Sequence, residues 1–286
     1  MRPQGLERLN AWRKASPFNP YWLDRLHLRS SVEALAPLAA GRLLDVGVSL
    51  RPYGDLFEPY VDRYVGLDYP PSILDKQPEM WAILHRARSL IDVFGDGNRL
   101  PFADASFDTV LCTEVLEHLP TPAACMTEMV RVLKPGGRLL LTVPFIQPLH
   151  ELPFDYYRFT PSGLEDLMRA QGLEVERIEP RGNFASALGA MASQFLLRTL
   201  GATEKQRDGS VILSRWRSAL LLPFLALLQL FFHLASKVTR DDAVAQGYSA
   251  VARKPERVPA ARAEEARDAT RHVAAPSSGG REGALA

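Results

Sequence analysis

The first 180 residues alternate between short apolar runs and longer amphipathic stretches, with turn residues between them. Short apolar runs are typical of buried strands, whereas apolar residues that repeat every three or four positions indicate helices. The predicted strands are 42–45, 63–68, 90–94, 108–112, 138–143 and 173–178. The predicted helices begin after the Ser30-Ser31 pair and cover 122–133 and 164–170. Strands that alternate with helices predict a parallel sheet with helices on both faces.

The pattern changes in the second half of the chain, where long apolar stretches replace the alternation. Residues 184–200 are predicted to form an apolar helix, and a charged break follows at 204–209. The most hydrophobic segment comes next, the nineteen residues SALLLPFLALLQLFFHLAS at 218–236. Basic residues flank this segment on both sides, namely Arg215, Arg217, Lys237 and Arg240.

Three interpretations of the segment 218–236 compete. Nineteen residues are close to the lower limit of a membrane-spanning helix, and Pro223, Gln229 and His233 interrupt them. An interfacial or re-entrant helix fits the basic flanks, which suit anionic lipid head groups. A buried core helix or an interface between subunits is the third interpretation. The sequence favours contact with a membrane and leaves its depth open.

A last short run, GYSAVAR at 247–253, is predicted to return to the sheet as one more strand. The fold class is then α/β, a doubly wound and mostly parallel seven-stranded sheet with a hydrophobic helical insertion before the last strand. The expected regions are a leader and helix with a candidate lid at 1–40, the core at 41–183, the insertion at 184–240, the last strand at 241–254 and a disordered tail at 255–286.

Composition and charge exclude several classes of protein. Thirty-four Lys and Arg against thirty-three Asp and Glu give a net charge of +1, whereas a general nucleic-acid binder carries a large basic excess. Cys112 and Cys125 are too few for a disulfide-rich secreted protein, and we expect both to be small buried apolar residues. No apolar run follows the N-terminal charges, so we expect no secretory signal and a cytoplasmic location.

The first candidate site lies at the end of the first predicted strand, in Leu44-Asp45-Val46-Gly47. Ligands of open α/β sheets bind at the carboxyl ends of the strands, and a glycine there lets the backbone approach a ligand closely. Asp68 ends the second predicted strand, at the spacing of the acidic residue that holds a ribose diol in nucleotide-binding sheets. Each signal alone also fits an ordinary turn or helix cap.

Four segments together resemble the successive motifs of class I S-adenosylmethionine-dependent methyltransferases of the type 11 subgroup. They are LLDVGVSLRPYGDLF, YVGLDYP, GDGNRLPFADASFDTVLCTEVLEHLP and EMVRVLKPGGRLLLTVPF, and the resemblance covers roughly residues 40–180. The segment HELPFDYYRFTPSGLEDLM resembles a branch associated with cell-surface polysaccharide or glycolipid synthesis. The resemblance implies S-adenosylmethionine as the cofactor.

The resemblance also implies a role for each motif residue. The residues implied to bind the cofactor are Asp45, Gly47, Ser49, Asp68, Tyr69, Asp96, Gly97, Thr113 and Glu114. The first loop would lie beside the amino-acid part of the cofactor. Asp68 would bind the ribose hydroxyls, with Tyr69 against the adenine and Asp96 at the exocyclic amine. Thr113 and Glu114 would line the methionine end.

The first loop departs from the family pattern at one position. The usual sequences are DxGCGxG and DxGCGxxPY, and here Ser49 stands in place of the second glycine, ahead of Pro52 and Tyr53. If the position needs a positive φ, serine is strained there by about 1 kcal/mol. If it needs only a small side chain, serine fits and adds a hydroxyl donor. The Pro-Tyr pair favours a retained site over a degenerate, non-catalytic one.

The acceptor side is predicted to come from the loop after the fifth strand. Methyl transfer is an in-line displacement, so the protein holds the acceptor in position and excludes water. A hydroxyl acceptor benefits from a general base, and His150, with Glu151 beside it, is the candidate. Tyr156, Tyr157 and Arg158 are the candidate substrate-binding residues, as an aromatic and cationic wall. The alternatives are that His150 only hydrogen-bonds the turn that follows and that this turn braces a lid.

Two further expectations concern residues near these motifs. His118, in VLEHLP, recurs in the family near the cofactor pocket, and we expect a structural role for it first. The positions of cysteines, histidines and acidic residues show no metal-ligand cluster, so we expect no metal. The aromatic residues of the leader are candidates for a lid over the cofactor or for packing, namely Trp12, Phe18, Tyr21 and Trp22.

The sequence therefore predicts an S-adenosylmethionine-dependent methyltransferase that O-methylates a sugar, a glycolipid or another amphiphilic acceptor at the inner face of a membrane. The expected partners are a small-molecule or lipid-linked acceptor and a membrane surface, with no nucleic acid, and the oligomeric state is open. One alternative is a soluble acceptor with an insertion that dimerises. Another is a degenerate methyltransferase-fold binding protein docked at the membrane. A dinucleotide dehydrogenase is disfavoured because the first turn lacks GxGxxG.

Overall fold

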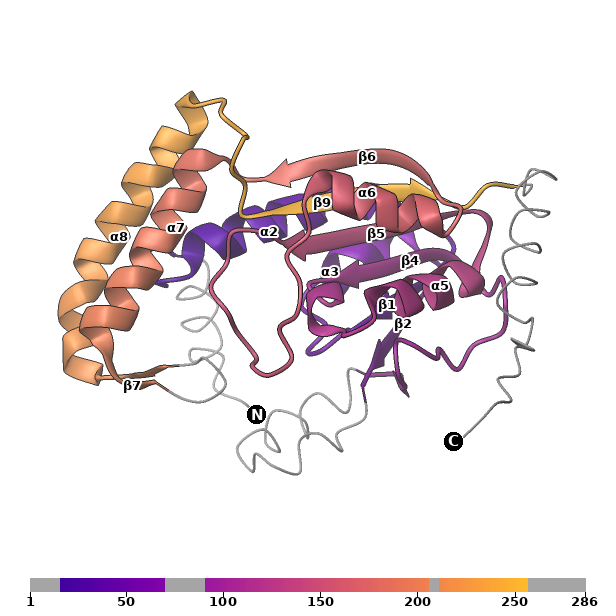
Figure 1. Cartoon of the computed structure of the whole chain (residues 1–286), viewed down its shortest axis with the longest axis horizontal. Helices are drawn as coiled ribbons and strands as arrows, with labels where there is room; N and C mark the ends of the chain where they lie inside the picture. The colour runs from indigo at the N-terminus through magenta and orange to yellow at the C-terminus, as the bar shows by residue number, and fades with distance from the viewer. Residues whose placement is uncertain (1–15, 70–90, 206–210, 257–286) are drawn as a thin grey trace, which may run out of the picture.

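A seven-stranded sheet forms the centre of the computed structural model, which describes residues 16–69, 91–205 and 211–256 (Figure 1). The strands are β1 (Arg42–Val46), β2 (Arg63–Asp68), β3 (Val93–Phe94), β4 (Phe107–Thr113), β5 (Leu133–Pro144), β6 (Glu174–Arg181) and β9 (Gly247–Arg253). Their order is β3-β2-β1-β4-β5-β9-β6, with β9 antiparallel to both neighbours and the pairs from β3 to β5 parallel. The predicted fold class is confirmed, including the late return of the last strand.

Strand β5 begins earlier than the sequence predicts. The four residues Lys134-Pro135-Gly136-Gly137, between the predicted helix 122–133 and the predicted strand 138–143, are part of the strand. The pairing of β5 with β4 shifts register between Phe107 and Thr109. Gly136 has φ +79°, and its amide donates to the carbonyl of Lys254 at 2.8 Å. The segment is therefore an irregular start of the strand, held by the chain that leaves β9, rather than a free turn.

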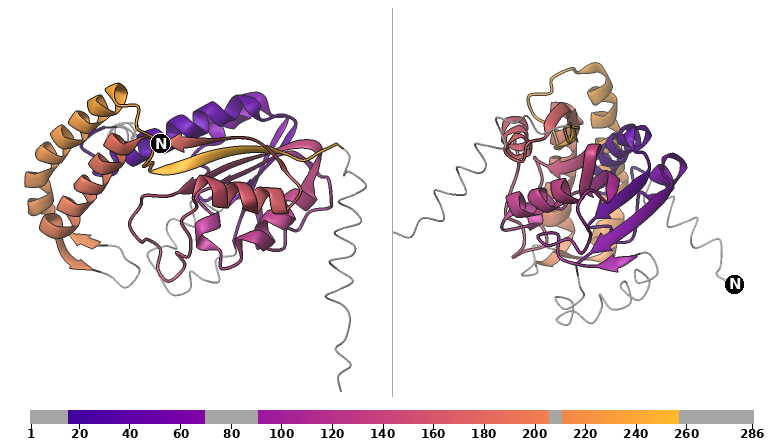
Figure 2. Two further views of the ribbon diagram at one scale, coloured as in Figure 1. Left: turned by 45° about the horizontal axis from the view of Figure 1, so that its top comes forward. Right: turned by 90° about the vertical axis from the view of Figure 1, so that its right-hand side faces the viewer.

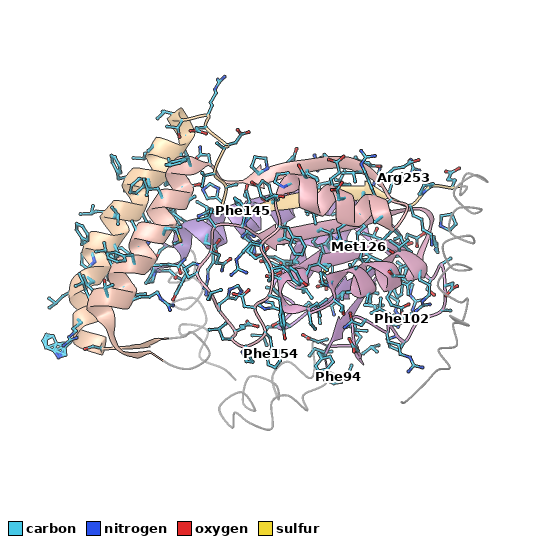
Figure 3. The ribbon with its side chains drawn as sticks, viewed as in Figure 1. Phe94, Phe102, Met126, Phe145, Phe154 and Arg253 are labelled. Atoms are coloured by element: carbon cyan, nitrogen blue, oxygen red, sulfur yellow. The ribbon has the colours of Figure 1, made fainter. Side chains whose placement is uncertain are left out.

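Helices cover both faces of the sheet (Figure 2). On one face lie α2 (Trp22–Leu35) and α3 (Gly54–Phe57), which bury Val32, Leu35 and Phe57. On the other lie α5 (Pro122–Val132) and α6 (Pro161–Ala170), which bury Met126, Met129, Leu164 and Met168 (Figure 3). The predicted start of the first helix is wrong, because α2 begins at Trp22 and the Ser30-Ser31 pair lies inside it.

The insertion forms a pair of long helices beyond the carboxyl ends of the parallel strands (Figure 1). Its elements are α7 (Phe184–Leu196), a π-helical turn at Leu197–Gly201, β7 (Ala202–Lys205), β8 (Val211–Leu213) and α8 (Arg215–Val238). The two short strands pair with each other, so the charged break predicted at 204–209 begins in a strand, and its later part lies outside the described residues. We call α7 and α8, with the connection between them, the helical hairpin.

Polar side chains fasten the inner side of α8 to α2 and to the segment just before it. Gln229 is fully buried, and its Nε2 donates to the carbonyls of Pro17 at 2.8 Å and Asn19 at 2.9 Å. The ring of His233 meets the edge of Trp22, with 5.1 Å between ring centroids. The two polar residues that interrupt the apolar segment thus face the core and leave its outer side apolar.

The outer side of α8 is exposed. One helical segment in the described residues, Ala219–Val238, is long and apolar enough to cross a membrane, with a mean hydropathy of 1.9. Only 17% of its most apolar window is buried within the chain. The described part of the chain does not cover this surface, which disfavours a buried core helix.

Candidate cofactor and acceptor site

The loops that follow β1, β2 and β4 meet where the order of the strands reverses. From β1 the chain continues to β2 and β3 on one side, whereas β4 leads to β5 on the other. Ligands of open α/β sheets bind at such a switch point. Gly47 has φ +80°, and a Cβ on it would lie 2.4 Å from the side chain of Val115. Glycine is required at this position because the loop after β1 crosses the loop after β4 without room for a side chain.

Asp68 closes the loop after β1 from the side of β2. Its Oδ2 accepts a hydrogen bond from the Ser49 amide at 2.7 Å, and its Oδ1 accepts one from the Tyr69 amide at 2.7 Å. Burial raises the pKa of Asp68, and the two amides oppose that shift. Ser49 has φ +47°, so the position does need the left-handed conformation, and serine is strained there by about 1 kcal/mol.

Asp45 lies beneath the same loop, inside the sheet. The Tyr64 hydroxyl donates to Asp45 Oδ2, and Asp45 Oδ1 has no hydrogen-bond partner in the described part of the chain. Burial raises the pKa of Asp45 to about 7, against the effect of the Tyr64 hydrogen bond. The Arg51 guanidinium lies over the Tyr64 ring, 4.1 Å from its centroid. These contacts anchor the base of the loop.

Asp96 and Gly97 follow the short strand β3. Asp96 Oδ1 accepts hydrogen bonds from the Asn98 amide at 2.8 Å and from Asn98 Nδ2 at 3.1 Å. A Cβ on Gly97 would lie 3.1 Å from Cys125 Sγ, so the backbone runs close to α5 here. Cys125 and Cys112 are buried and unpaired, as predicted.

Glu114 directly follows Thr113, the last residue of β4. The buried guanidinium of Arg181, which could not be predicted from the sequence, holds Glu114 in place. Arg181, the last residue of β6, has no exposed surface, and its Nη1 donates to Glu114 Oε1 at 2.8 Å. Its Nη2 lies 3.6 Å from Asp24 Oδ1 on α2. Burial raises the pKa of Asp24, and the Arg181 charge opposes that shift. Nothing in the sequence distinguishes Arg181 from any other arginine at a strand end.

Arg158 braces the loop after β5, in which Figure 3 labels Phe145 at the start and Phe154 near the far tip. Its guanidinium donates to both oxygens of the Asp155 carboxylate and to the carbonyls of Gln147 and Pro148. Against the effect of burial, the Arg158 hydrogen bonds and the His150 amide lower the pKa of Asp155 to about 2. These contacts favour the alternative that this turn braces a lid, because they leave Arg158 few free N–H donors for a substrate.

Tyr156 and Tyr157 lie on the outside of the same loop, and both rings are exposed. The Tyr156 amide donates to the carbonyl of Glu117 at 2.8 Å, which places the loop directly on the turn after β4. Thr160 Oγ1 accepts from the Gly163 amide at 3.2 Å and caps α6, as the sequence predicts. The aromatic pair is thus available to a ligand that approaches from outside.

Ionisable side chains from the two loops meet at this contact. Glu117 is fully buried, and His118 Nε2 lies 3.6 Å from Glu117 Oε1 and 3.8 Å from Glu151 Oε2. The rings of His118 and His150 meet edge to face, with 4.9 Å between centroids. Burial, and then the nearby Glu114 carboxylate, raise the pKa of Glu117 well above its ordinary value. We call Glu117, His118 and His150 the acceptor-side cluster.

We expected no metal-ligand cluster from the sequence, but the acceptor-side cluster has the residue types and the spacing of one. One potential ligand atom from each of the three residues lies within 4.8 Å of the others. Glu117 and His118 are adjacent in the sequence, but His150 comes from the loop after β5. Only the packing of one loop on the other brings them together.

Known proteins share the central part of the chain. Residues 44–141 match the family model described as a methyltransferase domain. The chain is 39% identical over 114 residues to a demethylmenaquinone methyltransferase of Renibacterium salmoninarum, covering 40% of this chain and 45% of that protein. It is 31% identical over 166 residues to a protein of Mycolicibacterium smegmatis named a probable S-adenosylmethionine-dependent methyltransferase, covering 54% and 60%.

A solved structure with a similar fold contains the demethylated cofactor. It is the 1,6-didemethyltoxoflavin-N1-methyltransferase of Burkholderia thailandensis with bound S-adenosylhomocysteine, at 16% identity and a TM-score of 0.47, covering 82% of this chain and 80% of that one. The chain spans about half the length of the curated relatives it matches. The family match confirms the predicted methyltransferase domain at residues 44–141, and the Mycolicibacterium relative is named for S-adenosylmethionine, the cofactor that the sequence predicts.

Proposed function

We propose that the chain is an S-adenosylmethionine-dependent methyltransferase that methylates an oxygen of a sugar, a glycolipid or another amphiphilic acceptor at a membrane surface. One observation carries the enzymatic part. The loops that hold Gly47, Asp68 and Glu114 meet at the switch point of the sheet, inside the segment that matches a methyltransferase domain. The location at a membrane is supported separately, by the exposed side of the helical hairpin.

The residues at the switch point fit the cofactor. Gly47 leaves the loop after β1 without a side chain, and Asp68 is an ionisable carboxylate held in place by two amides. A carboxylate oxygen with one amide donor keeps a lone pair for a ribose hydroxyl. The residues proposed to hold the cofactor are Asp45, Gly47, Ser49, Asp68, Tyr69, Asp96, Gly97, Thr113 and Glu114. When bound, S-adenosylmethionine supplies an electrophilic methyl group on a sulfonium.

The acceptor side supplies positioning and a proton acceptor. His150 Nδ1 lies 3.2 Å from the carbonyl of Pro148, 3.4 Å from Asp155 Oδ2 and 3.5 Å from Arg158 Nη2. In the tautomer that donates from Nδ1 to Pro148, Nε2 has the free lone pair. Glu151 is next to it in the chain, and its side chain is 73% exposed. The proton of the acceptor hydroxyl passes to this pair as the oxygen is methylated. Tyr156 and Tyr157 offer exposed rings to the rest of the acceptor, beside the braced Arg158.

The helical hairpin supports a membrane surface as the place of action. The large apolar side chains exposed on α8 include Trp216, Leu220, Phe224, Leu227, Phe231 and Leu234. Soluble proteins rarely expose one continuous apolar surface of this kind, and basic flanks add attraction to anionic lipids. Gln229 and His233 fasten the opposite side of α8 to the core. The helix therefore lies along the surface of a bilayer rather than across it.

Binding to liposomes tests the membrane part. We expect the full chain to float with vesicles that contain anionic lipid, and the triple variant Leu220→Ser, Leu227→Ser, Phe231→Ser to stay in solution. Leu149→Ser, at a side chain exposed on another loop, is the control and floats like the natural chain. Equal flotation of all three proteins contradicts the proposal. A dimer in sedimentation without flotation supports a subunit interface instead.

An acceptor screen tests the chemistry. Lipid-linked sugars and glycolipids in vesicles are the first acceptors, and demethylmenaquinone, for which the Renibacterium relative is named, is the comparison. Transfer of labelled methyl to an oxygen of a sugar-containing lipid supports the proposal. Transfer only to demethylmenaquinone, or only to small soluble acceptors, contradicts this choice of acceptor.

A degenerate binding protein is the second candidate function, and one observation favours it. Ser49 occupies a left-handed position where the family pattern has glycine. If Ser49→Gly raises the affinity for S-adenosylmethionine from undetectable to micromolar, the natural site is degenerate. If the natural chain already binds the cofactor and Asp68→Ala abolishes that binding, the enzymatic function is favoured over this candidate.

A further inference from the structure

We infer that Glu117, His118 and His150 form a site for a divalent cation of the first transition series or zinc, on the acceptor side of the site. The binding itself does not depend on methyl transfer. What the cation does for the acceptor rests on the proposed function.

The spacing of the three side chains fits one shared ion. Ligands of such cations lie at about 2.0 to 2.2 Å from the metal, so two ligand atoms on one ion are roughly 3 to 4 Å apart. His118 Nε2 is 3.6 Å from Glu117 Oε1, and one ligand atom from each of the three residues lies within 4.8 Å of the others. Small rotations of the side chains bring the group to bonding distance.

Glu117 lacks the partners that a buried carboxyl group requires. Its side chain has no exposed surface, and neither Oε1 nor Oε2 has a hydrogen-bond partner within the described ranges. Buried polar atoms of folded proteins are almost always hydrogen-bonded, and a buried unpaired carboxyl is costly. A cation beside Glu117 Oε1 removes this cost, because it bonds the carboxylate directly.

The two histidine rings are oriented as metal ligands are. His118 Nδ1 lies 2.7 Å from the carbonyl oxygen of Phe154, so Nδ1 donates and the free lone pair of Nε2 faces Glu117 and Glu151. Without a cation or an added proton, that lone pair faces two acidic groups. His150 Nδ1 likewise faces the carbonyl of Pro148 and the Asp155 carboxylate. Metal-binding histidines usually donate their second ring nitrogen to such a carbonyl or carboxylate.

The ligand types select the class of cation. Two imidazoles and one carboxylate suit Mn²⁺, Fe²⁺, Co²⁺ or Zn²⁺ better than Mg²⁺ or Ca²⁺, which prefer oxygen ligands alone. Three protein ligands leave coordination positions open, as in catalytic rather than structural sites. Glu151, whose Oε2 is 3.8 Å from His118 Nε2, lies at the open side and is exposed.

A cation here refines the acceptor chemistry of the proposed function. An acceptor oxygen at an open position loses its proton more readily beside the positive charge. With His150 as a ligand, Glu151 is the group that receives this proton. The new O–CH3 bond forms as the S–CH3 bond of the cofactor breaks, and the cofactor leaves as a neutral thioether. Two adjacent oxygens on the acceptor, as in a sugar diol, match two open positions.

Manganese binding tests the site directly. The full chain is stripped with a chelator and titrated with Mn²⁺ while the electron paramagnetic resonance signal of the free ion is followed, with no cofactor or acceptor present. We expect one saturable site per chain, which Zn²⁺ displaces. Glu117→Gln and His118→Asn should each weaken binding by at least tenfold, and Glu33→Gln, an exposed carboxyl on α2, should leave it unchanged.

Two results overturn the inference. One is the absence of saturable binding to the natural chain by Mn²⁺ and by Zn²⁺. The other is binding that Glu117→Gln and His118→Asn leave intact, which places the ion elsewhere. If Glu117→Gln lowers the melting temperature so far that it unfolds, His150→Ala, at a partly exposed ring, replaces it. Titration of S-adenosylmethionine into the same samples reports on the proposed function independently of the metal.

Discussion

The proposed cofactor side and the proposed acceptor side of the site are built in different ways. The cofactor side uses backbone groups at strand ends, where the amides of Ser49 and Tyr69 bind Asp68 and where Gly47 has no room for a side chain. The acceptor side uses ionisable side chains, with Glu117 buried and His150 brought to it by a loop.

This difference in construction explains why proteins that share the fold can keep the cofactor side and vary the acceptor side. Pairing between strands fixes the positions of the strand ends, so a few residues near them suffice to build the cofactor side. Loops and insertions build the acceptor side, and these differ freely between proteins that share a fold.

Arg181→Met has the largest expected effect, since Arg181 is a fully buried charge that holds Glu114 on the proposed cofactor side. The change leaves Glu114 and Asp24 without their buried partner, and removal of one member of a buried ion pair costs about 3–5 kcal/mol of stability. Urea unfolding of the variant and the natural chain measures the loss. Arg177→Met, at an exposed residue on the same strand, is the control, and equal stability of all three proteins contradicts the role of Arg181.

His150→Ala should separate the two sides in kinetics. Loss of an acceptor-side group that binds or accepts a proton lowers turnover by roughly a hundredfold or more. Affinity for S-adenosylmethionine should change less than threefold, because His150 lies outside the proposed cofactor residues. Comparison of kcat with the calorimetric Kd checks this prediction. Full activity of the variant removes His150 from the chemistry.

Asp45→Asn should remove a dependence of stability on pH. Burial raises the pKa of Asp45 from 3.8 to about 7, so the folded state holds this proton more tightly than the unfolded state. The stabilisation from the protonated carboxyl is complete below about pH 4 and is lost as the pH rises through 7. Asparagine does not ionise, so the variant should gain roughly 2 kcal/mol relative to the natural chain between pH 5 and 7.

Urea unfolding at several pH values checks that difference. If the difference in free energy of unfolding between the two proteins is the same at every pH from 5 to 7, Asp45 does not titrate in this range and the prediction is wrong.

Ser49→Gly has the smallest expected effect. Relief of the left-handed conformation at φ +47° should raise stability by no more than about 1 kcal/mol. Cofactor affinity should rise by less than threefold, because the Ser49 amide that binds Asp68 is retained. Thermal unfolding and calorimetry measure both quantities. A much larger gain in affinity identifies the natural loop as degenerate.

The strands could be predicted because their apolar runs are continuous and end at turn residues. The bounds of β2, Arg63–Asp68, match the prediction, and so do those of β9, Gly247–Arg253. The start of α2 could not be predicted, because the N-cap residue Tyr21 makes no capping hydrogen bond with its side chain. Instead, Gln229 Oε1 from the distant α8 accepts a hydrogen bond from the Leu23 amide. Contacts between distant segments leave no local pattern in the sequence.

The same reason limits prediction of the site. Asp68 could be proposed from its place at a strand end, because the motif around it is local. Arg181 and the acceptor-side cluster depend on which segments pack together, and only the fold reveals that. The outward direction of the apolar side of α8 likewise depends on Gln229 and His233, which the sequence presents as interruptions.

Calorimetric titration of S-adenosylmethionine and S-adenosylhomocysteine into the full chain tests the central claim most directly. Asp68→Ala is the test variant, and Asp62→Ala, at an exposed residue just before β2, is the matched control. We expect micromolar binding to the natural chain and to Asp62→Ala, and at least a tenfold loss in Asp68→Ala with an unchanged melting temperature. Absence of binding to the natural chain, in solution and with liposomes, would contradict the claim.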